Sequence, residues 1–256
     1  MKYFLTIAAS DNSGGAGIQQ DLKIASLFGF WGLSAITGLT VQDFSGVDSV
    51  YPVQSEILRE QIEKCFVNFN VTTVKIGAIC SLKNIEIISD CLEKYSPKYV
   101  VLDPVFASSS GKMFFNRDEV DILRKRILPL VTIVKPNRFE LELISGRKLK
   151  DINTAKEIAN DLSRQYNCAF YISGGHFSGD QISEILIEKG SVYQVNKNRK
   201  KWSYTHGTGC TLTSAIACYL GQGNLLATSC KLATEFVTEF YDKIEYSFKS
   251  GKIYQK

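Results

Sequence analysis

Hydrophobic and polar positions follow two different periods along this chain. Short runs of apolar and β-branched residues, such as 3–9 and 98–103, have the length and composition of strands buried in a sheet. Stretches in which apolar residues return every three or four positions, such as 56–69 and 82–95, are typical of helices that cover a sheet. The same patterns predict strands at 31–41, 73–77, 131–134, 169–173, 183–187 and 191–195, and helices at 18–29, 119–128, 138–144, 154–166, 209–220 and 225–248.

The order of these elements indicates the fold class. Strands and helices alternate through most of the chain, which is typical of a mainly parallel sheet with helices on both faces. The segment 43–53 combines turn residues with short alternation and predicts a small hairpin or flap. We therefore expect an α/β protein that binds its ligands beyond the carboxyl ends of the strands. No repeat or change in composition marks a boundary, so we expect one domain over residues 1–256.

Composition argues against a nucleic-acid-binding, secreted or membrane protein. The chain has 45% hydrophobic and 22% charged residues and a formal net charge of +4, as in ordinary globular proteins. Its densest basic run, 197–201, lacks interleaved aromatic residues, so we expect no nucleic-acid partner. The short apolar start leads straight into a glycine loop, which favours a first strand over a signal peptide. No apolar run approaches the roughly 18 residues of a membrane span, so we expect a cytoplasmic protein without a membrane partner.

The cysteines and histidines indicate reduced thiols. Seven cysteines include no C-x-x-C pair, and two histidines are too few to suggest a zinc site. Free thiols are typical of a reducing compartment. Cys218 and Cys230 fit buried structural positions within the apolar C-terminal third.

The first candidate site is the loop 10–17, between the first strand and the first helix. Its small residues permit close approach to the backbone, and free amides at a helix start can bind an anion. The glycines do not complete a G-x-G-x-x-G dinucleotide pattern, because Gln20 stands at the third glycine position. A tight strand-to-helix turn explains the loop equally well. Asp21, one turn into the helix, favours a ligand, because it is placed to meet a polar group bound over the loop.

The second candidate site is the segment 135–140, which follows a strand of buried type. Asn137 and Glu140 are three residues apart and share one side of a helical turn. An amide and a carboxylate at a strand end can hold a hydrated Mg²⁺ ion. Capping of the helix N-terminus explains the pair more simply.

The third candidate site is the sequence THGTGCT at 205–211. Consecutive small residues lead into an apolar helix, so free N–H groups and the positive helix end converge into an anion hole. The chain has no G-x-x-x-x-G-K-[ST] sequence, so a nucleotide phosphate bound here would not lie in a P-loop. Cys210 falls in the first helical turn, where we expect the pKa of its thiol to be lowered.

Together these segments resemble the hydroxymethylpyrimidine and phosphomethylpyrimidine kinases of thiamine biosynthesis, which are members of the ribokinase-like superfamily. The matching segments occur in family order over nearly the whole chain, and together they make the resemblance specific. They are ASDNSGGAGIQQDLK (9–23), SAITGLTVQDFSGV (34–47), KIGAICS (75–81), VVLDPVFASSSG (100–111), KPNRFELELISG (135–146), SGGH (173–176) and THGTGCTLTSAIA (205–217).

The resemblance implies a ribokinase-like three-layer αβα sandwich, usually a homodimer, with a flap near 36–50. It implies that ATP and Mg²⁺ serve to phosphorylate 4-amino-5-hydroxymethyl-2-methylpyrimidine and then its monophosphate. It further implies that Cys210 accepts the proton of the substrate hydroxyl while the N–H groups of Gly207, Thr208 and Gly209 stabilise the transferred phosphoryl group. The other positions that it implies are Ala9, Gly17, Asp21 and Gln42 for the substrate, Asn137, Glu140, Ser173, Gly175 and His206 for ATP and its phosphates, and Asp103 and Glu140 for the metal.

Two departures from the family pattern concern lysines. Ser173 stands where the family commonly has lysine before Gly-Gly-His, and Ser109 stands where it has the lysine of an A-K-S-G segment. Both lysines would face phosphate, so their absence should weaken binding or transition-state stabilisation unless Lys112 or Lys135 substitutes. Two alternatives therefore stay open. One is a pyridoxal kinase, because some relatives share the G-T-G-C loop and both substrates are aromatic rings with a hydroxymethyl group, and the other is a non-catalytic relative that binds the pyrimidine phosphate.

Overall fold

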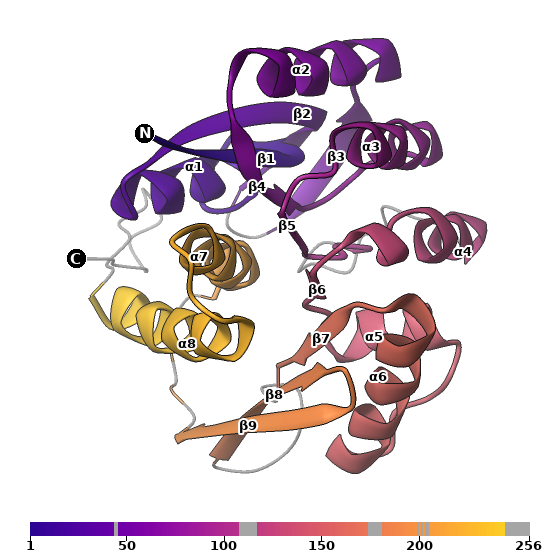
Figure 1. Cartoon of the computed structure of the whole chain (residues 1–256), viewed down its shortest axis with the longest axis vertical. Coiled ribbons are helices and arrows are strands. Elements are labelled where there is room, and N and C mark those ends of the chain that lie inside the picture. The colour runs from indigo at the N-terminus through magenta and orange to yellow at the C-terminus, as the bar shows by residue number, and fades with distance from the viewer. Residues whose placement is uncertain are drawn as a thin grey trace.

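A nine-stranded sheet forms the centre of the protein (Figure 1). The computed structural model describes residues 1–43, 46–107, 117–173, 181–198, 200, 202 and 205–243. The strands lie in the order β3-β2-β1-β4-β5-β6-β7-β8-β9. Their bounds are β1 (Lys2–Asp11), β2 (Phe30–Gln42), β3 (Val47–Pro52), β4 (Val71–Ile76), β5 (Tyr99–Leu102), β6 (Ile133–Val134), β7 (Ala169–Ile172), β8 (Gln181–Glu188) and β9 (Ser191–Asn198).

The strand directions confirm the predicted fold class. The six strands β2, β1, β4, β5, β6 and β7 pair with their neighbours in parallel. Strands β3, β8 and β9 pair antiparallel and form the two ends of the sheet. The predicted flap is the pair of β3 with the second half of β2, in which Leu39 lies opposite Tyr51.

Helices cover both faces of the sheet and complete a three-layer αβα sandwich (Figure 1). Three helices, α1 (Gly17–Leu27), α7 (Thr208–Gly221) and α8 (Leu226–Lys243), pack together on one face. The other face is covered by α2 (Ser55–Asn68), α3 (Leu82–Tyr95), α4 (Arg117–Arg126), α5 (Arg138–Ser145) and α6 (Ile152–Tyr166). Every helix in the described part of the chain is too short or too polar to cross a membrane.

The observed elements differ from the predicted ones at a few boundaries. The helix predicted at 119–128 is α4 followed by a 3₁₀ turn, η1 (Leu128–Leu130). Pro129 has no N–H group to donate and its ring clashes with the preceding turn, so the α-helix ends before it. The strand predicted at 131–134 is shorter, because only β6 pairs in the sheet. The last five residues of the helix predicted at 225–248 lie outside the described residues.

Alternation along the central strands sends side chains into two cores. On β4, Val74 and Ile76 face the larger core, which lies under α2 to α6. Thr73 and Lys75 alternate with these two residues and point to the opposite face, toward the smaller core under α1, α7 and α8. Thr6 of β1 lies opposite Lys75 in the strand register. A lysine and a threonine therefore enter the interior side by side.

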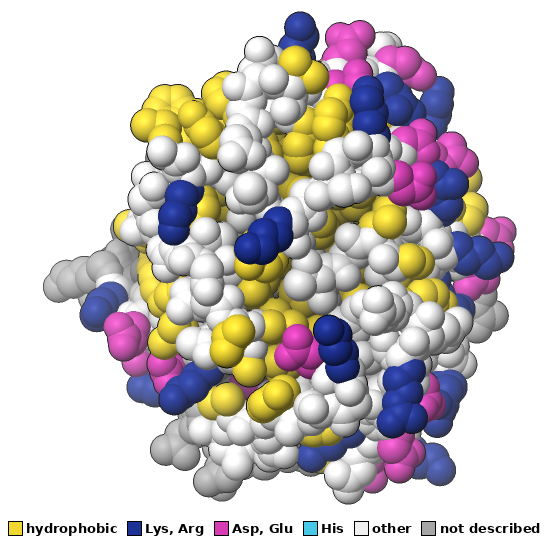
Figure 2. All heavy atoms as spheres, in the orientation of Figure 1, with side chains coloured by type: hydrophobic (Ala, Val, Ile, Leu, Met, Phe, Trp, Pro, Cys, Tyr) yellow, Lys and Arg dark blue, Asp and Glu magenta, His cyan; other side chains and the backbone are white. Residues whose placement is uncertain are grey.

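Charged side chains on the surface contribute little to this fold. On the face shown in Figure 2, lysine, arginine, aspartate and glutamate interleave over the edge formed by α2, α3 and α4, while hydrophobic side chains gather along the middle. Ion pairs such as Lys83 with Glu56 join these helices at exposed positions. An exposed pair contributes about 0–1 kcal/mol, so the interior has to supply most of the stability.

An ion pair is buried in the smaller core. Lys75 Nζ lies 2.9 Å from Asp21 Oδ2, and both side chains are 0% exposed. Asp21 also accepts hydrogen bonds from Thr6 Oγ1 at 2.6 Å and from Ser214 Oγ at 2.8 Å. Burial alone would lower the pKa of Lys75, but the negative charge of Asp21 raises it, so the ammonium group stays charged. The pair joins β1, β4, α1 and α7 at one point.

Replacing Lys75 by methionine should destabilise the protein strongly, because the carboxylate of Asp21 would remain buried without its countercharge. We expect the free energy of unfolding, measured by urea denaturation, to fall by about 3–5 kcal/mol. The double variant K75M/D21N should recover much of this loss, since no charge is then buried. As a control, Lys83→Met at the exposed pair should change stability by no more than about 1 kcal/mol. A K75M protein as stable as the wild type would contradict this role.

Candidate functional site

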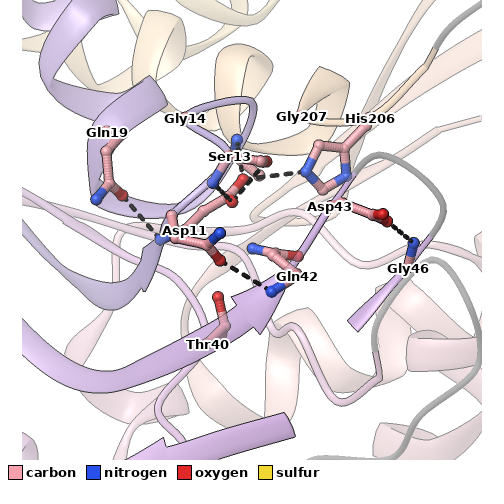
Figure 3. Close-up of polar contacts among 12 residues, drawn as sticks. Asp11, Ser13, Gly14, Gln19, Thr40, Gln42, Asp43, Gly46, His206 and Gly207 are labelled. Carbon is pink, nitrogen blue, oxygen red and sulfur yellow. Dashed lines mark hydrogen bonds and ion pairs between the residues drawn. The ribbon is translucent and has the colours of Figure 1, made fainter. Parts of the chain in front are cut away.

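The carboxyl ends of β1 and β4 mark the point where a ligand is expected. The chain places β2 on one side of β1 and β4 on the other, so the connections leave β1 and β4 in opposite directions. In doubly wound sheets, ligands bind in the crevice at such a point. The loop after β1 and the turn before α7 meet here, as the neighbouring Ser13, Gly14, His206 and Gly207 show (Figure 3).

Asp11, the last residue of β1, holds the glycine loop in shape. Its carboxylate accepts hydrogen bonds from the N–H and the hydroxyl of Ser13 at 2.8 and 2.7 Å and from the N–H of Ala16 at 2.7 Å. His206 Nε2 lies 3.1 Å from Asp11 Oδ2, so the same carboxylate links the loop to the turn before α7 (Figure 3). Burial alone would raise the pKa of Asp11, but the hydrogen bonds from His206, Ser13 and Ala16 together lower it to about 2. The carboxylate of Asp11 is therefore ionised, and it links the candidate segments 10–17 and 205–211.

Gly207 permits the close approach of these two segments. Its φ of +80° lies in the left-handed region, and a Cβ atom there would lie 1.9 Å from the carbonyl oxygen of Gly15. Gly207 is the N-cap of α7, and no side chain caps this helix. The predicted anion hole is altered in one respect, because the N–H of Thr208 already donates to the carbonyl of Thr205 at 3.2 Å. The N–H groups on either side, of Gly207 and Gly209, make no such turn bond to the described residues.

Cys210 lies in the first turn of α7, partly buried, and accepts a hydrogen bond from the N–H of Gly17. Burial raises the pKa of its thiol to about 11, and the carboxylates of Asp21 and Asp103 add to the rise. The ammonium of Lys75 and the N–H of Gly17 act in the opposite direction but do not overcome burial. The predicted lowering of this pKa is therefore wrong, since desolvation of the thiolate raises it by more than Lys75 and Gly17 lower it.

Asp21 does not face the loop above it, in contrast to the prediction. It is fully buried, on the same side of α1 as Ile24 and Ala25, and its carboxylate is engaged by the ion pair described above. The hydrogen bond that Asp21 accepts from Ser214 Oγ, together with the one that Gln20 Nε2 donates to Thr211 Oγ1 at 2.9 Å, ties α1 to α7. Asp21 thus links the N-terminal halves of both helices in the interior.

The other three residues predicted for the substrate lie around the crevice. Gly17 starts α1 with a φ of +57°, and a Cβ atom there would lie 2.4 Å from the carbonyl oxygen of Ala9. Gln42 ends β2, and its N–H donates to Asn12 Oδ1 at 2.8 Å (Figure 3). The end of the flap is therefore tied to the glycine loop. The close packing of Gly17 on Ala9 brings α1 near enough for the contact with Cys210.

A second group of charged side chains lies beside the first turn of α7. Asp103 follows β5, Lys135 follows β6, and both are buried, at 4% and 8% exposure. A Cβ atom on Gly209 would lie 3.3 Å from Asp103 Oδ2 and 3.9 Å from Lys135 Nζ. Burial and the charge of Asp103 raise the pKa of Glu140 to about 8, although Lys135 acts against the rise. The residues predicted for metal binding, Asp103 and Glu140, are thus close enough to repel each other.

The predicted capping of α5 is confirmed in full. Asn137 Oδ1 accepts a hydrogen bond from the N–H of Glu140 at 2.9 Å, and Glu140 Oε2 accepts one from the N–H of Asn137 at 2.7 Å. This capping box holds Glu140 beside Asp103. A pair of repelling carboxylates suits a cation such as Mg²⁺, which takes one or two carboxylates and completes its shell with water and phosphate oxygens. No group of three or more His, Cys, Asp or Glu side chains that could hold a metal occurs among the described residues.

Some predicted positions stay apart from this cluster. Ser173 follows β7 and is partly exposed, and the described contacts do not join it to the residues above. Gly175, Ser109 and Lys112 lie outside the described residues.

Asp11 and Lys75 hold the site together but are not among the site residues predicted from the sequence. Lys75 had a recognisable signal, since it is the one charged residue within the apolar strand predicted at 73–77. Alternation places such a residue in the interior, where it needs a countercharge. Asp11 had a weaker signal, as an acid at a strand end followed by small residues.

Comparison with known proteins agrees with this arrangement. The family model for phosphomethylpyrimidine kinase matches residues 11–256. The chain is 32% identical over 252 residues to the hydroxymethylpyrimidine/phosphomethylpyrimidine kinase of Aquifex aeolicus, covering 98% of this chain and 97% of that protein. A crystal structure of the phosphomethylpyrimidine kinase of Clostridium difficile 630 is similar with a TM-score of 0.82 and 36% identity, over 93% of this chain and 99% of that one. The pyridoxal kinase of Staphylococcus aureus in complex with AMP-PCP gives a TM-score of 0.88 at 27% identity, over 97% and 91% of the two chains.

Replacing Asp11 by asparagine should lower stability in a pH-dependent manner. A pKa of about 2 in the folded protein, against about 3.9 in an unfolded chain, corresponds to about 2.6 kcal/mol. Because the folded pKa is the lower one, this contribution is complete above about pH 5 and is lost as the pH falls through about 2. We expect D11N to be about 2.6 kcal/mol less stable than the wild type at neutral pH, and the difference to shrink in acid.

Urea unfolding at about pH 7, 5 and 3 measures this difference. Glu93→Gln, at an exposed position of α3, is the control and should show no such trend. A difference between D11N and the wild type that stays constant down to about pH 3 would show that the charge of Asp11 is not what matters.

Proposed function

Because this chain belongs to the phosphomethylpyrimidine kinase family, we propose that it phosphorylates 4-amino-5-hydroxymethyl-2-methylpyrimidine and then its monophosphate, with ATP as the phosphoryl donor. The observation that carries the proposal is the first turn of α7. It combines a partly buried thiol, an uncapped helix N-terminus and the side chains of Asp103 and Lys135 within one small region. A thiol beside an anion site can serve as the proton acceptor when a phosphoryl group is transferred to a hydroxyl.

In the proposed reaction, the hydroxymethyl oxygen attacks the γ-phosphorus of ATP and the bond to the bridging oxygen of ADP breaks. Cys210, as thiolate, accepts the proton of the hydroxyl group. The N–H groups of Gly207 and Gly209 face the charge on the transferred group, and the Asp11–His206 contact keeps their turn in place. Gln42 at the end of the flap contacts the polar edge of the pyrimidine. Asp103 and Glu140 would hold Mg²⁺, which neutralises phosphate charge when it is bound.

Pyridoxal kinase is the second candidate function. The similarity to the S. aureus pyridoxal kinase in complex with AMP-PCP supports both this alternative and the use of ATP. Phosphomethylpyrimidine kinase is preferred, because the family model and the C. difficile relative, at 36% identity, both carry that description.

We further propose that the protein works as a homodimer. Leu39, Val41 and Tyr51 are exposed large hydrophobic residues on one face of the flap. Leu39 and Tyr51 are cross-strand partners, and β3 is an edge strand of the sheet. An edge strand with an apolar face is usually covered by another surface, and a second copy of the flap would cover it.

We also propose a cytoplasmic location and a single functional domain. All seven cysteines are free thiols, which supports a reducing compartment. The continuous nine-stranded sheet supports one domain, because its strands are drawn from both halves of the chain.

The purified protein with Mg²⁺ and ATP should convert hydroxymethylpyrimidine to its mono- and diphosphate, with a higher kcat/KM than for pyridoxal. Cys210→Ala should lower kcat by about 10²–10⁴-fold, because the proton acceptor is lost. Cys218→Ala, at a fully buried position about two turns further along α7, is the matched control and should retain activity. ATP consumption and product masses measure the outcome.

Two results of this assay would favour one of the alternative functions instead. A higher kcat/KM for pyridoxal would favour the pyridoxal kinase. Binding of the pyrimidine phosphate without ATP consumption would favour a non-catalytic relative.

The kcat/KM for the pyrimidine should rise with pH. This parameter reports the ionisation of the free enzyme, in which the thiol of Cys210 has a pKa of about 11. The thiolate fraction then grows about tenfold for each pH unit between about 7 and 9, and we expect the rate to follow it. A flat profile over this range would show that the thiolate of Cys210 is not the proton acceptor.

A further inference from the structure

Lys135 is a nearly buried lysine without a hydrogen-bond or ion-pair partner among the described residues. It is 8% exposed, and among the described residues no acceptor hydrogen-bonds to its Nζ and no carboxylate lies within ion-pair distance. Lys75, the other buried lysine of this region, is paired with Asp21 at 2.9 Å. An ammonium group held in the interior without a partner is unfavourable. An anion bound to the ammonium group would explain why a lysine occupies this buried position.

The ammonium of Lys135 points at the N-terminus of a long helix. Its Nζ lies 3.9 Å from the position that a Cβ atom of Gly209 would take. Helix α7 has 14 residues and no capping side chain, so its positive end and its free N–H groups are directed to the same place. Asp103 Oδ2 lies 3.3 Å from the same point and would repel an anion on its own. The lysine therefore supplies the positive charge that makes this place suitable for phosphate.

Neutralisation of the two nearby carboxylates is the competing explanation for Lys135. The structure argues against it, because Lys135 forms no ion pair with Asp103 or Glu140 among the described contacts. A lysine whose role was to keep Glu140 ionised would be expected to pair with it.

We propose that Lys135 Nζ binds a non-bridging oxygen of the phosphoryl group during its transfer, as the cation that replaces the lysines absent at Ser109 and Ser173. This inference rests on the proposed function. The bond between the substrate oxygen and the γ-phosphorus forms as the bond to ADP breaks, and the hydroxyl proton passes to Cys210.

The test compares Lys135→Met with Lys148→Met, a matched control on an exposed lysine that pairs with Glu142. For K135M we expect kcat with the pyrimidine to fall by about 100-fold while its KM changes by less than about threefold. K135R should retain more activity than K135M, since it keeps the charge. K148M should match the wild type.

Nucleotide binding separates phosphate recognition from a structural effect. Calorimetric titration with AMP-PCP and with ADP should show that K135M loses about tenfold more affinity for AMP-PCP, because that ligand carries the third phosphate. A merely structural role would weaken both ligands alike. Thermal unfolding checks each variant, and K135Q, which also removes the charge, carries the test if K135M does not fold.

The inference and the proposed function fail in different ways. If K135M retains wild-type kcat and AMP-PCP affinity, Lys135 does not bind the phosphoryl group, although the protein remains a pyrimidine kinase. If the wild type phosphorylates no pyrimidine, the proposed function fails. The AMP-PCP and ADP titrations then still show whether Lys135 meets the third phosphate, and equal losses for the two ligands would overturn the inference.

Discussion

The candidate site is built over one buried interaction, the ion pair between Asp21 and Lys75. The carboxylate of Asp21 also accepts hydrogen bonds from Thr6 and Ser214. Strands β1 and β4 and helices α1 and α7 therefore all contribute a residue to this one network. Burying two charges is unfavourable unless their hydrogen bonds are all made. The four residues of the network therefore constrain one another's positions. Their arrangement sets α1 against α7 and brings the N–H of Gly17 to Cys210.

The two loops above this pair are shaped by close backbone contact. Gly207 has to lie against the carbonyl of Gly15, and Gly17 against that of Ala9, at distances where a Cβ atom would collide. Asp11 then fastens the first loop to His206. Packing this tight leaves the N-terminus of α7 without a capping side chain. The helix end that forms the anion hole is thus a consequence of how the glycines allow the loops to meet.

Sequence pattern predicted the architecture better than the electrostatics of the site. The periods of the apolar residues are local, so most strands, helices and the capping box of Asn137 and Glu140 could be located in advance. The environment of Asp21 could not, because its countercharge lies 54 residues away and only the assembled sheet brings it near. For Cys210, the effect of the helix N-terminus is visible in the sequence. The stronger effect of burial arises only from the packing of α1 and the neighbouring strands.

The raised pKa of Cys210 determines what the site has to supply for catalysis. With a pKa of about 11, forming the thiolate at neutral pH requires about 5 kcal/mol, whereas an aspartate there would already be ionised. The pKa of the thiol is several units above that of an aspartic acid, so the thiolate is the stronger base. A stronger base accepts the hydroxyl proton more readily, which recovers part of the energy spent in forming the thiolate. The lowering effect of Lys75 is already included in the pKa of about 11, so the remainder has to come from further positive charge near the sulfur when the reactants are bound. The rate therefore depends on the charges that the fold gathers under and beside α7, and not on the cysteine alone.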